Sequence, residues 1–309
     1  MPVRAGPFAS ATLNILVIKL SALGDFVLAF GPFAAIRAHH PGARITLLTT
    51  APYAHLARKA PWFDQVLVDA RPRWWEFPGL LRLRSTLRGG RFDMVYDLQT
   101  SGRSSHYFRL MGGRVRWSGI APGASHPHAN PARDRMHTLD RQQEQLAMAG
   151  ITDFPSPDLS WLRGDDPFGL QHPYALLVPG AAPHRPEKRW PAEKFRAVAA
   201  ALAARGTLPV VVGSRAEASL AAAVGPEARD LTGRTDLAGL AAVAADAALA
   251  VGNDTGPMHL AAALGVPSLV LFGGASDPLL TAPRGPHVRV LRAPDLRLLG
   301  EAEVVAALP

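Results

Sequence analysis

Three loops of the chain carry side chains that could bind or transform an anionic substrate, and each loop follows a short apolar run. In "VIKLSALGDFVLAF", Gly24 and Asp25 stand where a strand gives way to a helix. A carboxylate at that position often caps or charges the first helical turn, but it could also act as a general base. Gly24 would let a ligand or another backbone segment approach closely. The residue types alone leave both roles of Asp25 open.

The second loop, in "VGNDTGPMHLAAALGV", has the pattern of an anion site. A strand is expected to end at Gly252, Pro257 to take the first position of the helix that follows, and Gly265 to end that helix. Backbone N–H groups at such a helix start, together with the positive end of the helix dipole, bind phosphate or diphosphate. The alternative is ordinary capping by Asp254 and Thr255. His259 alone would more often be a core residue than a ligand.

The third loop, "PGAAPHRPEKRWP", places Arg185, Lys188 and Arg189 just before a helix start. Cations there oppose the helix dipole, so binding of an anion explains them better than a structural role does. After the next strand, Glu217 could accept both hydroxyl groups of a ribose. An ordinary first-turn glutamate explains Glu217 equally well.

The elements that must position these loops follow one pattern, in which short Val-, Ile- and Leu-rich runs alternate with stretches of helical length. Apolar runs of this kind are typical of parallel strands buried on both faces. The alternation stops between residues 151 and 173, where Pro, Asp and Gly accumulate, and then restarts. The pattern predicts an α/β protein with two Rossmann-like, doubly wound domains facing a central cleft, residues 1–165 and 166–309. Ligands of such sheets bind at the carboxyl ends of the strands, where the three loops lie.

The composition and the absence of several known motifs exclude some classes of protein and of binding site. A chain of 309 residues with 48% hydrophobic residues can bury a large core, and the absence of cysteine excludes disulfides and thiolate metal sites. The sequence shows no secretory signal and no apolar segment long enough to cross a membrane. It also has no Walker A loop, G-x-G fingerprint, Asp-x-Asp pair or HExxH motif. We therefore expect neither a cofactor nor a metal ion.

Charge is distributed unevenly along the chain. Residues 1–165 contain 20 Lys and Arg against 12 Asp and Glu, whereas residues 166–309 contain 13 of each. The excess is either a basic surface without a partner or a face that meets an anion. In "RPRWWEF", Trp74 and Trp75 either pack a loop against the domain or enter a membrane interface where arginine meets anionic lipid. No basic helix or aromatic strand platform indicates a nucleic acid partner.

Four segments resemble successive motifs of glycosyltransferase family 9, the lipopolysaccharide heptosyltransferases: "IKLSALGDFVLAF", "RFDMVYDLQTSGRSS", "PGAAPHRPEKRWPAEKF" and "VGNDTGPMHLAAALGVPSLVLFGGASDP". The resemblance spans residues 14–278. It implies the GT-B architecture, with the acceptor held by the first domain and the nucleotide sugar by the second. It also implies inversion at the anomeric carbon without a metal ion.

The resemblance further implies the partners of the enzyme. The donor would be a nucleotide-diphosphate sugar, ADP-heptose, and the acceptor a lipid-anchored saccharide, Kdo-lipid A or a heptosylated core. An enzyme acting on that acceptor would be cytoplasmic and peripheral at the cytoplasmic face of the inner membrane, in transient contact with its anionic surface. That location would account for the basic first half.

Roles for single residues follow from the same resemblance. Asp25 would be the general base. The acceptor would be contacted by Gly24, Arg103 and Ser104, helped by further loop arginines among Arg71, Arg73, Arg133 and Arg135. The donor would be bound by Lys188, Glu217, Asp254, Thr255, Gly256, Pro257, Met258 and His259, with backbone N–H groups of Thr255, Gly256, Met258 and His259 facing its diphosphate. The chain departs from some family members by having Pro183 and His184 where they have threonines.

Two other functions stay open at this point. A nucleotide-sugar epimerase of related fold would need carboxylates and a histidine in the cleft, but no basic acceptor face. A non-catalytic nucleotide-sugar binding protein would not need both Asp25 and Lys188. Turnover of the donor without an acceptor would identify the epimerase, and absence of any turnover would identify the binding protein.

Overall fold

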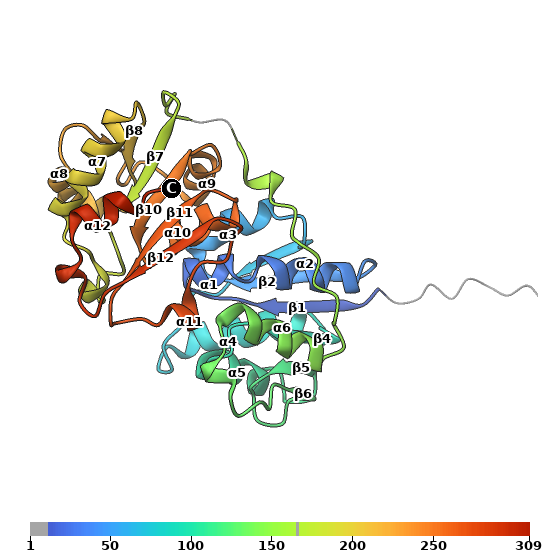
Figure 1. Ribbon diagram of the computed structural model, residues 1–309. Coiled ribbons are helices and arrows are strands. Elements are labelled where there is room, and N and C mark those ends of the chain that lie inside the picture. Colours follow the sequence, from blue (N-terminus) through green and yellow to red (C-terminus); the bar gives the residue numbers. More distant parts are fainter. Residues whose placement is uncertain (1–11, 165–166) are drawn as a thin grey trace, which may run out of the picture. The chain divides into compact units, whose positions relative to one another are not determined.

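The computed structural model (Figure 1) describes residues 12–164 and 167–309 and contains two six-stranded sheets in which every strand pair is parallel. The first sheet has the order β3-β2-β1-β4-β5-β6 and the second the order β12-β11-β10-β7-β8-β9. Counted from the first strand of each half, both are the same 3-2-1-4-5-6 order of a doubly wound sheet. The predicted α/β fold with two Rossmann-like halves is confirmed.

The strands of the first sheet are β1 (Asn14–Ile18), β2 (Arg44–Thr49), β3 (Gln65–Val68), β4 (Met94–Asp97), β5 (Arg116–Gly119) and β6 (His126–Pro127). The helices up to the end of this half are α1 (Leu23–Val27), α2 (Phe30–His39), α3 (Ala51–Lys59), α4 (Phe77–Gly89), α5 (Gly102–Leu110), the 3-10 turn η1 (Arg133–Arg135) and α6 (Thr138–Met148). Strand β1, "NILVI", is buried over four of its five residues, as expected for a central strand.

The strands of the second sheet are β7 (Tyr174–Val178), β8 (Leu208–Val211), β9 (Arg229–Asp230), β10 (Leu249–Asn253), β11 (Ser268–Phe272) and β12 (Val288–Arg292). Its α-helices are α7 (Phe195–Ala204), α8 (Ala218–Val224), α9 (Leu237–Ala245), α10 (Gly256–Ala263), α11 (Pro278–Thr281) and α12 (Glu301–Ala306). The 3-10 turns of this half are η2 (Ser160–Leu162), η3 (Pro186–Lys188), η4 (Ala192–Lys194), η5 (Arg215–Glu217) and η6 (Leu296–Leu298).

Apolar helix faces cover the sheets and form their cores. In the first half, α4 and α5 contribute Leu83, Leu87 and Tyr107 to a cluster around the fully buried Trp117. In the second half, α7, α8 and α12 pack on the odd-numbered residues of β7, β10 and β11. These cores hold the strand ends, and so the loops that follow them, in fixed positions.

Helix α10 shows how the local sequence sets an element that matters for the site. Thr255 stands before the helix in an extended conformation, and Pro257 fits the first turn because its missing N–H is not needed there. The chain leaves the helix through Gly265, whose φ of +83° places it in the left-handed region that favours glycine. The helix thus begins at Gly256, one residue before the predicted first position at Pro257, and its predicted end is confirmed.

Contacts in space divide the described chain into two compact units. The first unit comprises residues 12–20, 33–129 and 145–153, and the second comprises Ser21–Pro32, Asn130–Glu144 and the described residues from 154 onward. Helix α1 follows β1 directly but belongs to the second unit by its contacts. The predicted domain limits, 1–165 and 166–309, divide the chain in sequence order and stay a prediction.

None of the helices in residues 12–164 and 167–309 combines the length and the hydrophobicity that crossing a bilayer requires.

Candidate active site

The strand order of the second sheet reverses between β7 and β10, which are neighbours. The loops that follow these two strands meet at the carboxyl ends of the strands. Asn253, the last residue of β10, is fully buried and connects them. Its Nδ2 donates to the carbonyl oxygens of Pro179 (2.8 Å) and Gly180 (3.3 Å), and its Oδ1 accepts from the backbone N–H of Trp190 (2.9 Å). One amide side chain therefore fixes both ends of the 179–190 loop to β10. Switch points of this kind are where doubly wound sheets bind ligands.

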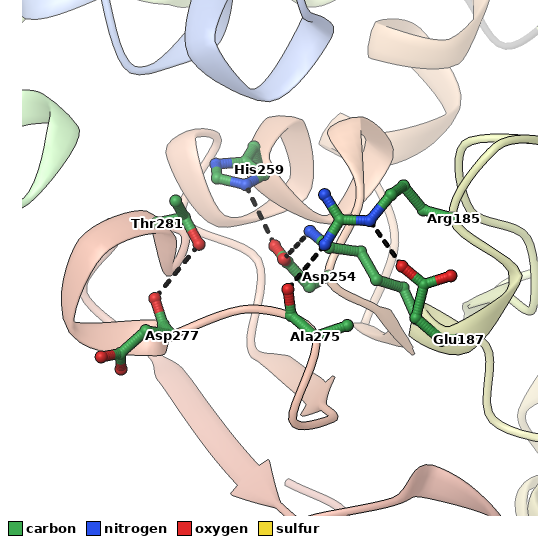
Figure 2. A network of polar contacts seen from close by, with 8 residues as sticks. Arg185, Glu187, Asp254, His259, Ala275, Asp277 and Thr281 are labelled. Atoms are coloured by element: carbon green, nitrogen blue, oxygen red, sulfur yellow. Dashed lines mark hydrogen bonds and ion pairs between the residues drawn. The ribbon is translucent and has the colours of Figure 1, made fainter.

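The 179–190 loop presents Lys188 to the residue that follows β10. Lys188 Nζ donates to Asp254 Oδ2 over 2.6 Å. Figure 2 shows Asp254 at the centre of the surrounding polar network. Arg185, on the same loop, donates to Glu187 Oε1 and to the carbonyl oxygen of Ala275, both over 2.6 Å. The indole N–H of the fully buried Trp190 donates to the carbonyl oxygen of Leu299 (3.1 Å). The loop is thus held at several points.

Asp254 is an ionised carboxylate in a buried position. Its side chain is only 5% exposed, against 18% for Lys188. Burial would raise the pKa of the Asp254 carboxyl, but the contacts with His259 and Lys188 outweigh it and hold the pKa below its ordinary value. The Nε2 atom of His259 lies 3.7 Å from Asp254 Oδ1, longer than a hydrogen bond. The arrangement keeps a negative charge next to a cation at the edge of the sheet.

The start of α10 offers fewer free N–H groups than the sequence predicted. The N–H groups of Met258 and His259 both donate to the carbonyl oxygen of Thr255, over 3.0 and 3.4 Å. Both N–H groups therefore already have an acceptor within the helical turn, and their role as donors to a diphosphate stays a prediction. Among the residues that the structure describes, no protein acceptor faces the N–H groups of Thr255 and Gly256. Those two remain available to an anion.

A cavity of about 490 Å³ lies in the second unit in front of this helix start. Asp25, half-buried on α1, lines it. The other predicted site residues that line it are Gly24, Lys188, Asp254, Thr255, Gly256, Pro257 and His259. The structure therefore brings the candidate base and most of the candidate donor contacts to one cavity. Its size suits a small ligand.

Two predicted donor residues do not line this cavity. Glu217 Oε2 accepts from the N–H (2.7 Å) and the hydroxyl (2.8 Å) of Ser214, so the carboxylate serves as a helix cap. Its other oxygen lies beside Gly180, where a Cβ would collide with it. Met258 is fully buried, and its sulfur packs next to Gly252. These positions give Glu217 a structural role at the ends of β7 and β8 and Met258 a packing role.

The two acceptor candidates of the first unit stand at the start of α5, after β4. The Ser104 hydroxyl is fully buried and forms a reciprocal cap with Ser101. Arg103 Nη1 donates to the carbonyl oxygen of Pro72 (3.3 Å) and so holds the loop that carries Trp74 and Trp75. Ser104 is therefore placed to fix the helix start, whereas part of the Arg103 side chain remains exposed.

Sequence reasoning missed two residues of the site. Asn253, the amide that joins the loops, could have been noticed as a polar residue ending an otherwise apolar strand. Thr281, from α11, lines the cavity and donates from its hydroxyl to the carbonyl oxygen of Asp277 (3.3 Å). No motif in the sequence around Thr281 indicated that this residue belongs to the site. Within the described residues, no group of three or more His, Cys, Asp or Glu side chains is arranged to hold a metal ion.

Comparisons with known proteins give a consistent result. The family model described as "Glycosyltransferase family 9 (heptosyltransferase)" matches residues 80–301. Lipopolysaccharide heptosyltransferase 1 of Pseudomonas aeruginosa is 30% identical over 291 residues, which cover 84% of this chain and 79% of that protein.

Solved structures show the fold. ADP-heptose lps heptosyltransferase II of E. coli superimposes with a TM-score of 0.76 at 24% identity, over 95% of this chain and 97% of that one. E. coli heptosyltransferase WaaC, solved with ADP-2-deoxy-2-fluoro heptose, gives a TM-score of 0.77 at 22% identity, over 94% and 98% of the two chains. The two sheets are thus the GT-B fold that the sequence predicted.

Proposed function

Because the chain belongs to glycosyltransferase family 9, the heptosyltransferases, and is accordingly a glycosyltransferase, we propose that it transfers heptose from ADP-heptose to the inner core of lipopolysaccharide. One observation carries the proposal. The carboxylate of Asp25, the first residues of α10 and the Lys188 side chain line the same cavity. A sugar nucleotide bound there would have its diphosphate at the helix start and its anomeric carbon toward Asp25.

The proposed reaction is a single displacement with inversion. The oxygen of an acceptor hydroxyl attacks the anomeric carbon from the face opposite the diphosphate, and the bond from that carbon to the diphosphate oxygen breaks. The hydroxyl proton passes to the Asp25 carboxylate. This transfer comes late, as the attacking oxygen becomes acidic, and general-base assistance of this kind contributes about 10² to 10⁴ in rate. The sugar ring passes through an oxocarbenium-like transition state.

Negative charge that develops on the leaving diphosphate would be stabilised by the chain itself. We propose that Lys188 and the N–H groups of Thr255 and Gly256 donate to it, assisted by the dipole of α10. Asp254, ionised and buried, would accept hydrogen bonds from hydroxyl groups of the donor sugar. These groups would carry out charge stabilisation without a metal ion.

The donor is tested by a thermal-shift screen against ADP, GDP, UDP and TDP and their sugars. A ligand present at 100 times its Kd stabilises the folded state by about 2.7 kcal/mol. We expect ADP and ADP-heptose to raise the melting temperature by several degrees, and the other nucleotides not to. If a different nucleotide raised the melting temperature instead, the donor would be a sugar of that nucleotide and not ADP-heptose. Release of the sugar without an acceptor would indicate an epimerase or hydrolase, and no release with a heptose acceptor would indicate a binding protein.

The acceptor side of the proposal includes a membrane contact. Trp74, Trp75, Phe77 and Leu81 are all more than half exposed, with Trp74 at 76%. Together with Arg71, Arg73, Arg82 and Arg84 we call them the Trp–Arg patch. Exposed aromatic and basic side chains of this kind suit the interface of an anionic bilayer. We propose that the patch places the enzyme at the cytoplasmic face of the inner membrane, where a lipid-anchored acceptor would lie.

Replacing both Trp74 and Trp75 with Ala should weaken binding to phosphatidylglycerol vesicles by at least about tenfold, because two large interfacial side chains are lost. Vesicle sedimentation at low salt measures this. The Leu298→Ala variant, which removes an equally exposed apolar side chain from the second unit, is the control and should bind like the wild type. Equal binding by all three proteins would remove the patch from the proposal.

A further inference from the structure

Helices α1 and α10, both in the second unit, approach each other through two glycines. A Cβ on Gly24 of α1 would lie 2.7 Å from Cδ2 and 2.9 Å from Nε2 of His259 on α10. A Cβ on Gly256, the first residue of α10, would lie 2.6 Å from Cβ and 2.7 Å from Cγ of Leu23. Neither glycine has a positive φ, so space rather than backbone conformation requires it.

The contact is reciprocal, because each helix has a glycine and a side chain of the other helix occupies the space where a Cβ would lie. Gly24 receives the His259 ring, and Gly256 receives Leu23. Asp25 follows directly on Gly24, and Gly256 carries one of the two free N–H groups. The separation between the carboxylate and the start of α10 is thus set by these two close contacts.

The His259 ring depends on this packing for its orientation. The side chain is buried, and within the part of the chain that the structure describes its Nδ1 atom has no hydrogen-bond partner. Its Nε2 faces Asp254 Oδ1 over 3.7 Å, as Figure 2 shows, which is too long to fix the ring. The ring is therefore held by its close packing against Gly24 of α1.

We propose that Gly24 and His259 are positioning residues that fix Asp25 at reacting distance from the diphosphate site. The proposal rests on the proposed function and gives Gly24 a steric role in place of an acceptor contact. Reacting atoms must come within about 3 to 3.5 Å, and a misplacement of about 1 Å can cost about 100-fold in rate. A methyl group on Gly24 would force a 2.7 Å contact to widen by about 1 Å toward the ordinary separation of about 3.5 to 4 Å.

The Gly24→Ala variant tests this. We expect kcat of transfer to fall about 100-fold, while the Kd for ADP, measured by calorimetry, stays within about threefold because Lys188 and the α10 start are intact. The control is Gly31→Ala in α2, close in sequence and with no atom within 4 Å of the added Cβ, which should keep wild-type kcat. A Gly24→Ala enzyme with wild-type kcat, or one that lost ADP affinity in parallel, would overturn the proposal.

A double-mutant cycle with His259→Ala separates positioning from general damage. The clash needs both the added methyl and the imidazole ring, so adding Gly24→Ala to His259→Ala should cause no further loss of kcat. Independent effects that multiply would contradict the proposal.

The same four proteins give a readout that does not depend on activity. Alanine is a better helix former than glycine, so Gly24→Ala should raise the melting temperature in the His259→Ala background and lower it in the wild type. The same sign in both backgrounds would overturn the steric contact. If the wild-type protein transfers no heptose, the proposed function fails, and these melting temperatures still decide whether the contact exists.

Discussion

The Asp25→Asn variant is expected to lose heptose transfer by about 10² to 10⁴-fold while its affinity for ADP changes little. Asparagine has the shape of aspartate, so α1 keeps its packing, but the amide cannot take the proton of the acceptor hydroxyl. The donor contacts that we propose come from other groups of the same cavity, such as the Lys188 side chain and the backbone N–H of Thr255. The change should therefore appear in kcat and not in the Kd for ADP.

Initial rates of ADP release and calorimetric titration with ADP measure the two quantities separately. The matched control is Glu301→Gln, which alters an exposed carboxylate in the first turn of α12. It should behave like the wild type. Retained turnover in Asp25→Asn would refute the assignment of the base. Parallel loss of ADP affinity would mean that Asp25 acts in donor binding.

The Lys188→Ala variant is expected to weaken ADP binding by about 10- to 100-fold. A hydrogen bond that involves a charged group contributes about 1.5 to 3 kcal/mol, and 1.4 kcal/mol corresponds to a tenfold change in Kd. The same change leaves the Asp254 carboxylate buried without its cation. We therefore also expect a loss of roughly 1 to 3 kcal/mol in the free energy of unfolding.

The pH dependence of stability separates these two effects. The pKa of Asp254 is held below its ordinary value, so its ionised form stabilises the wild-type fold above that value, and the stabilisation is lost as pH falls through the lowered pKa. Without Lys188, burial would be opposed less strongly, so the pKa of Asp254 should be lowered less and the protein should lose less stability as pH falls. Urea midpoints between about pH 3 and 7 measure this, with the exposed Lys59→Ala as control. Unchanged ADP affinity would refute the diphosphate assignment, and an unchanged pH profile would show that the ion pair contributes nothing to folding.

The fold could be predicted from the sequence because parallel strands buried on both faces leave continuous apolar runs. Strand β1 is such a run, and the helix that begins near Pro257 is marked by proline at its start and glycine after its end. The strand order could not be read from these patterns, because it depends on which strands pair in space. The grouping of α1 with the second unit has the same cause. It follows from contacts between Gly24 and His259, 235 positions apart.

The sequence predicted those parts of the candidate site that lie at or after the carboxyl ends of strands. Asp25, Lys188 and Asp254 each lie in a loop or helix start that follows an apolar strand, and the structure places all three at one cavity. What sequence could not show is how each polar group is already used. The N–H of Met258 is occupied by a helical turn, and the Glu217 carboxylate by a cap.

The second unit consists of three separate segments of the chain, and this limits where the enzyme can be divided into fragments or joined to parts of its relatives. Because it takes in Ser21–Pro32 and Asn130–Glu144, no single cut in the chain separates it from the first unit. A fragment that began at residue 166 would lack α1 and would expose to water the surface of α10 on which Leu23 and Gly24 pack. Chimeras that join the N-terminal half of one relative to the C-terminal half of another would have to match the residues on both sides of that contact.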